Sequence, residues 1–296
     1  MNIEHLRAQI DNIDTQLVDL FKDRMQIALE IARYKKENGL PVYDLTRERS
    51  LLHKISIRAG DEFEIYMRVF FSTLMDVSRS YQHKYLADAT TLSATITRAI
   101  EQTPKLFPEK AVIACQGAEG GGAQLATDRL FSVPDIFYFS TFDGVFQAVC
   151  NGMCQYGLLP IENSSTGSFK QIYDLFLDFN VYIVRSLSMT DEQGNITRYI
   201  CISKKLEIYP GADRTSLMMI VPNKSGALYR VLVRFYALGM NLLKHESCPI
   251  PGHTADVMFY FDVESPVYAP TLLQLISELE NQMEGFRYLG SYRDVK

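Results

Sequence analysis

The stretch that decides the fold runs from Met1 to Asn38 and reads MNIEHLRAQIDNIDTQLVDLFKDRMQIALEIARYKKEN. Apolar residues recur in it mostly in steps of three and four, the spacing of one helix face. They are Ile3, Leu6, Ile10, Ile13, Leu17, Leu20, Ile27, Ile31 and Tyr34. A helix of this length spans about 57 Å, which is too long for a lone small domain to cover. The stretch therefore predicts a helix that packs along a second copy of the chain.

Basic side chains accompany this apolar face. Arg24 stands where the spacing calls for an apolar residue, and Lys35 points the same way about 16 Å further along the helix. A basic group on an apolar face needs an anion to meet it. The alternative is an arginine at the edge of the face with its guanidinium in water. Arg7 is rotated off that direction and is expected to face a different neighbour.

Two further helices are predicted after a Gly-Leu-Pro break at residues 39–41. The first begins at Asp44, which is placed to cap it, and the second covers about residues 62–86. Polar side chains on these helices lie three or four residues apart and therefore share a face. They are Asp44, Arg47 and Glu48 on the first helix, and Ser78 and Gln82 on the second. Three helices thus contribute polar groups to one predicted anion-binding pocket.

This pattern resembles the all-helical class of chorismate mutase, in particular the N-terminal domain of the bifunctional chorismate mutase/prephenate dehydratases of phenylalanine biosynthesis. The residues that carry the resemblance are Arg7, Arg24, Lys35, Asp44-x-x-Arg47-Glu48 and Ser78-x-x-x-Gln82. It implies an isomerase that converts chorismate to prephenate. It also implies a homodimer in which Arg7 of one chain reaches the pocket of the other. The rearrangement is intramolecular, so no cofactor and no metal are expected.

The resemblance also implies a role for each residue. Arg24 and Arg7 of the partner subunit hold the two carboxylates of the substrate. Lys35 and Gln82 donate hydrogen bonds to the ether oxygen. The ring hydroxyl and the local charges are oriented by Asp44, Arg47 and Glu48, and Ser78 contacts a carboxylate. The residues expected to be catalytic are Lys35, Gln82, Arg24, Arg7 and Glu48.

Composition limits the class of protein. The chain has 296 residues, 47% of them hydrophobic and 22% charged, which suits two or three soluble globular domains. Its net charge of −5 and the lack of a basic run argue against a nucleic-acid partner. There is no signal-peptide core and no apolar run of membrane-spanning length. The five cysteines, without a C-x-x-C pair, predict reduced thiols in a cytoplasm.

The pattern of elements predicts four segments. Residues 1–86 form the all-helical domain, and residues 87–108 form a linker with a short helix around residues 97–102. Residues 109–205 alternate short strands and helices, which predicts an α/β lobe with a largely parallel sheet. Residues 206–296 follow the order βαββαβ, the ferredoxin-like arrangement.

Three motifs of the α/β lobe resemble the prephenate dehydratase domain. They are the glycine-rich loop Gln116-Gly-Ala-Glu-Gly-Gly-Gly-Ala-Gln124, the segment Pro160-Ile-Glu-Asn-Ser164, and Thr197-Arg198-Tyr199. The resemblance implies a dehydratase-like site of Glu162, Asn163, Ser164, Thr197 and Arg198, with the threonine as the catalytic residue. Without the resemblance, these segments are interpreted as turns and helix caps.

One half of that domain is missing from the sequence. In the family, the substrate cleft lies between two lobes, and the chain returns from the second lobe on the T-R-[FY] strand. Here only the seven residues Thr190 to Ile196 separate the outgoing strand from Thr197, too few for a lobe. Gly122-Ala123 also stand where the family has a hydroxyl-bearing residue. We therefore expect dehydratase activity to be lost.

The C-terminal segment carries two motifs that resemble the phenylalanine-binding motifs of the ACT domain. They are Ser225-Gly-Ala-Leu228 and Glu246-Ser-Cys-Pro249, so the implied effector-binding residues are Gly226, Ala227, Leu228, Glu246 and Ser247. Ser225 replaces the usual proline and Cys248 the usual arginine, whose guanidinium has five donors. Weakened phenylalanine binding is expected. A glycine at a helix start is also common in ferredoxin-like domains of any function.

Two other functions are consistent with the same residues. The first is a fully bifunctional enzyme, with a dehydratase cleft completed between chains, which makes phenylpyruvate from chorismate. The second is a non-catalytic amino-acid sensor whose helical domain serves only for dimerisation.

Overall fold

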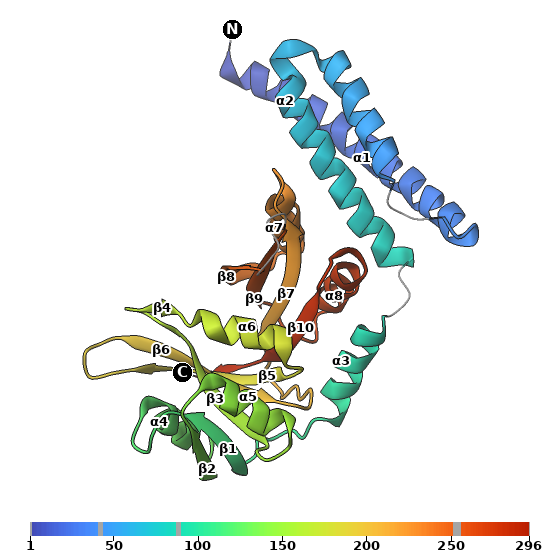
Figure 1. Ribbon diagram of the computed structural model, residues 1–296. Coiled ribbons are helices and arrows are strands. Elements are labelled where there is room, and N and C mark those ends of the chain that lie inside the picture. Colours follow the sequence, from blue (N-terminus) through green and yellow to red (C-terminus); the bar gives the residue numbers. More distant parts are fainter. Residues whose placement is uncertain (1, 41–43, 87–89, 251–255, 296) are drawn as a thin grey trace. The chain divides into compact units, whose positions relative to one another are not determined.

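The computed structural model describes residues 2–40, 44–86, 90–250 and 256–295. They form two compact units, Met1–Asp88 and Ala89–Lys296, each of which is described by itself (Figure 1). Within the described residues, no helix has an apolar stretch of the length needed to cross a bilayer.

The first helix, α1 (Ile3–Glu37), confirms the long helix predicted from the sequence. The Asn2 side chain caps it by accepting the N–H of Glu4 at 3.2 Å. Its buried residues are Met25, Ala28 and Ala32. The predicted apolar face, in contrast, stays in solvent. Eight of its side chains are 47–65% exposed, namely Ile3, Ile10, Ile13, Leu17, Leu20, Ile27, Ile31 and Tyr34.

Helix α2 (Leu45–Leu86) is interrupted at Gly60, whose φ of 70° and ψ of 168° are not helical. Glycine has no Cβ to oppose that conformation, so the chain reverses there. The first arm is capped by Asp44, whose Oδ1 accepts the N–H of Arg47 at 2.9 Å. The two predicted helices are therefore confirmed as the two arms of α2. In Figure 1, the second arm runs beside α1 in the same direction.

Helix α3 (Thr91–Gln102) begins six residues before the short helix predicted in the linker. The hydroxyl of Thr90 caps it by accepting the N–H of Ser93 at 3.1 Å. Ile96 and Ala99 are buried in the same apolar cluster as residues of the C-terminal module. This part of the expected linker therefore belongs to the core of the second unit.

The α/β lobe contains five central strands flanked by three helices. Its elements are β1 (Lys110–Gln116), α4 (Gly122–Leu130), β2 (Val133–Phe139), α5 (Phe142–Cys150), β3 (Tyr156–Asn163), β4 (Gly167–Ser168), α6 (Lys170–Asp178), β5 (Tyr182–Thr190) and β6 (Ile196–Ser203). A short strand near the C-terminal end of the sequence, β11 (Asp294–Val295), joins the same sheet. The strand order is β11-β5-β6-β3-β1-β2, with β4 paired to β3.

This sheet is mixed, so the prediction of a largely parallel sheet was wrong. Strand β1 is parallel to β2 and β3, whereas β6 is antiparallel to both β3 and β5. The reason is the short turn between β5 and β6, since a parallel pair needs a crossover of a dozen or more residues. In that turn, Oδ1 of Asp191 accepts the N–H groups of Gln193 and Asn195 at 2.9 and 2.8 Å. No second lobe stands between these two strands, as the sequence predicted.

The C-terminal module confirms the predicted βαββαβ order. Its elements are β7 (Arg214–Pro222), α7 (Ala227–Ala237), β8 (Asn241–Pro249), β9 (Asp256–Glu264), α8 (Pro270–Gln282) and β10 (Arg287–Tyr292). They form an antiparallel sheet in the order β10-β7-β9-β8.

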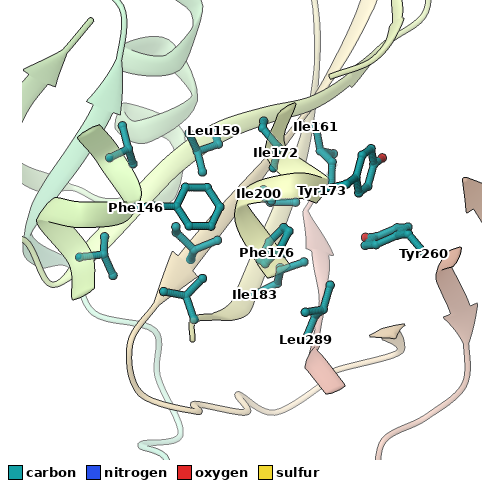
Figure 2. Close-up of a cluster of buried hydrophobic side chains, with 14 of the residues drawn as sticks. Phe146, Leu159, Ile161, Ile172, Tyr173, Phe176, Ile183, Ile200, Tyr260 and Leu289 are labelled. Atoms are coloured by element: carbon teal, nitrogen blue, oxygen red, sulfur yellow. The ribbon is translucent and has the colours of Figure 1, made fainter. Parts of the chain in front are cut away.

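The lobe and the module share a hydrophobic core (Figure 2). The ring of Tyr173 on α6 meets that of Tyr260 on β9 edge to face, with centroids 4.8 Å apart. The backbone also joins them, because the short strand β11 (Asp294–Val295) pairs with Ser186 and Leu187 of β5. The hydroxyl of Ser186 donates to Oδ1 of Asp294 at 2.5 Å. The two parts therefore fold as one unit.

Candidate functional site

In the helical unit, the structure brings Arg24 and Ser78 together. The guanidinium of Arg24 on α1 donates to Oγ of Ser78 on the second arm of α2. Ser78 is 5% exposed, and its hydroxyl donates to the carbonyl of Leu74 at 2.8 Å. Burial lowers the pKa of Arg24, and no carboxylate of the described residues forms an ion pair with it. An anion bound here would compensate that charge.

A second charged group lies one residue further along the same arm. Arg79 forms ion pairs with Glu48 on the first arm and with Asp76 on its own arm. Its side chain is 10% exposed, that of Glu48 19% and that of Asp76 3%. Glu48 is among the residues predicted from the sequence, whereas Arg79 and Asp76 are not. One local signal could have identified Arg79 and Asp76, because they are a base and an acid three residues apart on a predicted helix.

The other predicted mutase residues take different positions. Arg7 and Arg47 are exposed, and Asp44 is exposed while it caps α2. Lys35 and Gln82 are half-buried. Lys35 follows Arg24 on α1 and Gln82 follows Ser78 on the second arm, and these two helices run in the same direction (Figure 1). Lys35 and Gln82 therefore lie toward the same end of the unit, beyond the contact between Arg24 and Ser78.

In the α/β lobe, the antiparallel register of β3 and β6 brings the dehydratase-like residues together. It sets Glu162 opposite Arg198 and Asn163 opposite Thr197. The amide of Asn163 donates to Oγ1 of Thr197 at 2.7 Å. The N–H of Ser164 donates to the carbonyl of Ile196 at 2.8 Å. These residues therefore lie together where β3 ends and β6 begins.

The side chain of Arg198 points into the C-terminal module. Its Nε donates to Glu162 at 2.5 Å, and its Nη2 lies 2.7 Å from Oδ2 of Asp262 on β9. Burial opposes the charge on Arg198, but the neighbouring acidic groups, Asp262 first among them, outweigh that effect and raise the pKa of Arg198 above its ordinary value. Asp262 is fully buried and also accepts the hydroxyls of Ser216 and Tyr260 at 2.5 Å each. The guanidinium of Arg198 is therefore buried and paired with carboxylates of the protein.

Glu162 connects this pair to strand β8. Lys244 on β8 pairs with Glu162 and donates to Oγ of Ser168 at 2.8 Å. Burial would raise the pKa of Glu162, but Arg198 and Lys244 together hold it below its ordinary value. Sequence reasoning missed Lys244 and Asp262, because nothing local to either residue indicates a partner in the lobe.

The glycine-rich loop has no room for a larger residue at Gly122. A Cβ built on Gly122 would lie 2.3 Å from the hydroxyl oxygen of Tyr199. The phenol of Tyr199 therefore fills the space beside Gly122. The loop is held by Gln124, whose Oε1 accepts the N–H of Gly120 at 2.6 Å and the hydroxyl of Tyr138 at 2.8 Å.

The predicted effector residues lie at the start of α7 and on β8. Gly226 caps α7 with a φ of 79°, and Ala227 and Leu228 pack against the core of the module. Glu246 accepts the hydroxyl of Ser168 at 2.7 Å, and Ser247 is exposed. Cys248 is 4% exposed, and burial raises the pKa of its thiol to about 11. Cys248 therefore lies in the apolar core.

All five cysteines are free thiols. In the part of the chain that the structure describes, no group of three His, Cys, Asp or Glu side chains is arranged to hold a metal ion.

Comparison with known proteins finds matches to both parts of the chain described above. A family model described as chorismate mutase type II matches residues 6–83, and one described as prephenate dehydratase matches residues 113–190. The bifunctional chorismate mutase/prephenate dehydratase of Aquifex aeolicus is 22% identical, over 98% of this chain and 97% of the relative. That of Escherichia coli K12 is 21% identical, over 97% and 95%. The chain belongs to the family of bifunctional chorismate mutase/prephenate dehydratases.

This family member is shorter than its relatives. Its alignment with the Aquifex aeolicus enzyme extends over 373 positions, more than the 296 residues of this chain. The relatives thus contain residues with no counterpart here, in agreement with the short turn between β5 and β6.

Solved structures also match part of this chain. Prephenate dehydratase from Streptococcus mutans matches with a TM-score of 0.57 and 24% identity, over 62% of this chain and 99% of that one. GqqA, described as a novel type of quorum quenching acylase, matches with a TM-score of 0.56 and 29% identity, over 61% and 94%. The likeness to the Streptococcus mutans enzyme shows a shared fold.

Proposed function

We propose that the helical domain, residues 1–86, converts chorismate to prephenate in phenylalanine biosynthesis. The observation that carries this proposal is the half-buried Arg24, which is hydrogen-bonded to Ser78 and has no ion-pairing carboxylate among the described residues. Such a cation is suited to one carboxylate of a small dianion. The family membership of residues 6–83 supports the same reaction.

The reaction is an intramolecular [3,3] rearrangement, so the protein needs to supply position and charge. Its substrate must be held in a folded conformer while the ether C–O bond lengthens and negative charge develops on the oxygen. We assign Lys35 and Gln82 as donors to that oxygen, because donors that act on developing charge lower the barrier. Lys35 and Gln82 lie toward the same end of the helical unit, beyond the contact between Arg24 and Ser78.

The remaining residues orient the substrate. Ser78 and Arg24 hold one carboxylate, and Glu48 accepts the ring hydroxyl. Arg47 and Asp44 stand at the start of the first arm, where Asp44 also fixes the helix end. Their proposed part is to set the local charge around that hydroxyl.

We further propose that the active enzyme is a homodimer. The apolar face of α1 is exposed over its whole length, and burying it would stabilise a pair of chains. Arg7 precedes Arg24 by 17 residues, about 25 Å along a helix. One pocket cannot hold both from the same chain, so Arg7 of the partner subunit is assigned to the second carboxylate.

Loss of dehydratase activity is part of the proposal. Three features support it: the short turn in place of a second lobe, the phenol of Tyr199 against Gly122, and the burial of Arg198 against Asp262. A cleft with one wall does not exclude water or orient a dianion. In this proposal the lobe serves folding and spacing.

The C-terminal module is proposed to be an ACT domain with weakened phenylalanine binding. Cys248 has no cationic donor and packs in the core, and Glu246 is engaged by Ser168. The module contributes instead to the shared core of the second unit.

The deciding experiment gives the purified full chain chorismate and separates the products by chromatography. Prephenate alone is expected. Formation of phenylpyruvate would support the fully bifunctional alternative. Binding of chorismate or phenylalanine without turnover would support the sensor alternative. Calorimetric titration with phenylalanine, for the wild type and Cys248→Arg, tests the effector proposal separately.

A further inference from the structure

The contacts of Arg79 give it a part in the mutase site that the family pattern of residues does not assign. Arg79 is 8% exposed and reaches across the two arms of α2 to Oε1 of Glu48. On its own arm, it contacts Oδ1 of Asp76. The contact with Glu48 spans 31 residues of sequence, and the one with Asp76 spans three.

The two carboxylates differ in what else they are able to do. Asp76 is 3% exposed, and its Oδ2 is buried without a hydrogen-bond partner among the described residues. It has no route to a substrate, so its effect is to fix the orientation of the guanidinium. The Glu48 side chain is 19% exposed. Glu48 is therefore held by Arg79 through Oε1, and its side chain is still accessible to solvent.

Ser78 and Arg79 are consecutive residues, and each holds a charged group that comes from another helical segment. Ser78 holds the guanidinium of Arg24 from α1, and Arg79 holds the carboxylate of Glu48 from the first arm. One turn of the second arm thus fixes the separation of a cation and an anion. A substrate with a carboxylate and a hydroxyl would meet both groups.

We propose that Arg79 is a positioning residue for the mutase reaction, anchored by Asp76, which aims the carboxylate of Glu48 at the hydroxyl of the substrate. This inference rests on the proposed chorismate mutase function. A planar guanidinium suits this task better than an ammonium, because its fork contacts two carboxylates in fixed directions. Arg79 itself does not touch the substrate.

A double-mutant cycle tests the proposal in the full chain. The variants are Arg79→Met, Glu48→Gln and the double variant, with kcat and KM measured for chorismate. Arg79→Met is expected to lower kcat/KM roughly tenfold, and the double variant to lose no more than Glu48→Gln alone. A residue that serves only to hold the arms together would give additive losses, which would overturn the proposal. So would a folded Arg79→Met with normal kcat/KM, or a Glu48→Gln with normal turnover.

Arg79→Met leaves Asp76 as an unpaired buried charge and is at risk of not folding. The same cycle is therefore run with Arg79→Lys, which keeps the charge and loses the fork. A smaller loss, again absent in the Glu48→Gln background, is expected, and additivity in this cycle overturns the proposal as well. Arg68→Met is the matched control, because Arg68 makes an exposed ion pair with Glu64 on the same arm. Circular dichroism verifies the helical content of each variant.

The failure of this inference is distinguishable from that of the proposed function. If Lys35→Ala abolishes turnover while Arg79 and Glu48 act additively, the mutase assignment stands and the role of Arg79 is refuted. If the wild type does not convert chorismate, both are refuted.

Discussion

Nη2 of Arg198 and Oδ2 of Asp262 lie 2.7 Å apart, and the two side chains are 4% and 0% exposed. One residue comes from a strand of the α/β lobe and the other from the C-terminal module. The ion pair thus joins two parts of the chain that resemble separate domains. Removing Arg198 would leave Asp262 as an uncompensated buried charge, and removing Asp262 would leave Arg198 with Glu162 alone, which it shares with Lys244.

Asp262→Asn is therefore expected to lower the free energy of unfolding by roughly 3–5 kcal/mol. Combining it with Arg198→Met should cost much less than the sum of the two single changes, because no charge is then left unpaired. Urea unfolding of the full chain measures both. Glu192→Gln, on the exposed turn between β5 and β6, is the control and should stay within about 0.5 kcal/mol of the wild type. A loss under about 1 kcal/mol for Asp262→Asn would contradict the expectation.

The lowered pKa of Glu162 predicts a pH dependence of stability. Because its folded pKa lies below the ordinary value of 4.5, the unfolded state takes up the proton first as pH falls. Its contribution is therefore fully present above pH 4.5 and is lost as pH falls through the folded pKa. Glu162→Gln should have a lower melting temperature than the wild type at pH 7, and the difference should shrink below pH 4. A difference that stays constant between pH 7 and pH 3 would refute this.

Lys35→Ala should lower kcat/KM for chorismate by roughly a hundredfold or more, because it removes a donor to the ether oxygen. The helical content of the protein should not change, because alanine is a good helix former. Lys36→Ala is the control, since Lys36 is the next residue and is exposed. Stopped-flow or continuous absorbance assays of chorismate loss give kcat/KM for the two variants. Normal turnover by Lys35→Ala would exclude the assigned role.

A shared pocket predicts complementation between inactive chains. Arg7→Ala and Lys35→Ala, mixed and allowed to exchange subunits, should recover about a quarter of the wild-type activity, because half of the dimers are mixed and each has one intact site. Arg24→Ala mixed with Lys35→Ala should recover none, since both residues come from the same chain. Recovery in the second mixture, or none in the first, would argue against the proposed dimer.

Gly290 is predicted to tolerate no side chain. Its φ is 138°, and a Cβ there would lie 2.2 Å from the carbonyl oxygen of Ile183 on β5. Gly290→Ala should lower the free energy of unfolding by about 2 kcal/mol or more, through backbone strain and the clash. Gly194→Ala, on the turn with a φ of 84° and open space around it, is expected to cost about 1 kcal/mol. Equal losses for the two variants would show that the clash at Gly290 is relieved.

The sequence predicted elements wherever a local signal defines them. The spacing of apolar residues in α1, the cap at Asp44 and the βαββαβ order depend on neighbours in the chain, and all three are confirmed. The cap at Thr90 was also readable, because its hydroxyl precedes Ser93 by three residues, yet the start of α3 was placed too late. The short turn that indicated the missing lobe also requires β5 and β6 to be antiparallel. The prediction of a largely parallel sheet did not take this into account.

Contacts between distant residues were the part that could not be predicted. Glu162 and Arg198 were selected from motifs, but their partners Lys244 and Asp262 lie on strands that carry no motif for them. Arg79 was missed because the family pattern leaves the position after Ser78 open. In each case, the partner is set by how segments pack in three dimensions, which one sequence without relatives does not state.

Strand β11 comes to the sheet last during synthesis. Asp294 joins Ser186, which leaves the ribosome 108 residues earlier. Until β11 has been synthesised, β5 has an unpaired outer edge, and such edges recruit other strands. A stop codon or frameshift ahead of the codon for Asp294 would therefore leave the nascent lobe open to aggregation, although the mutase domain had been translated in full.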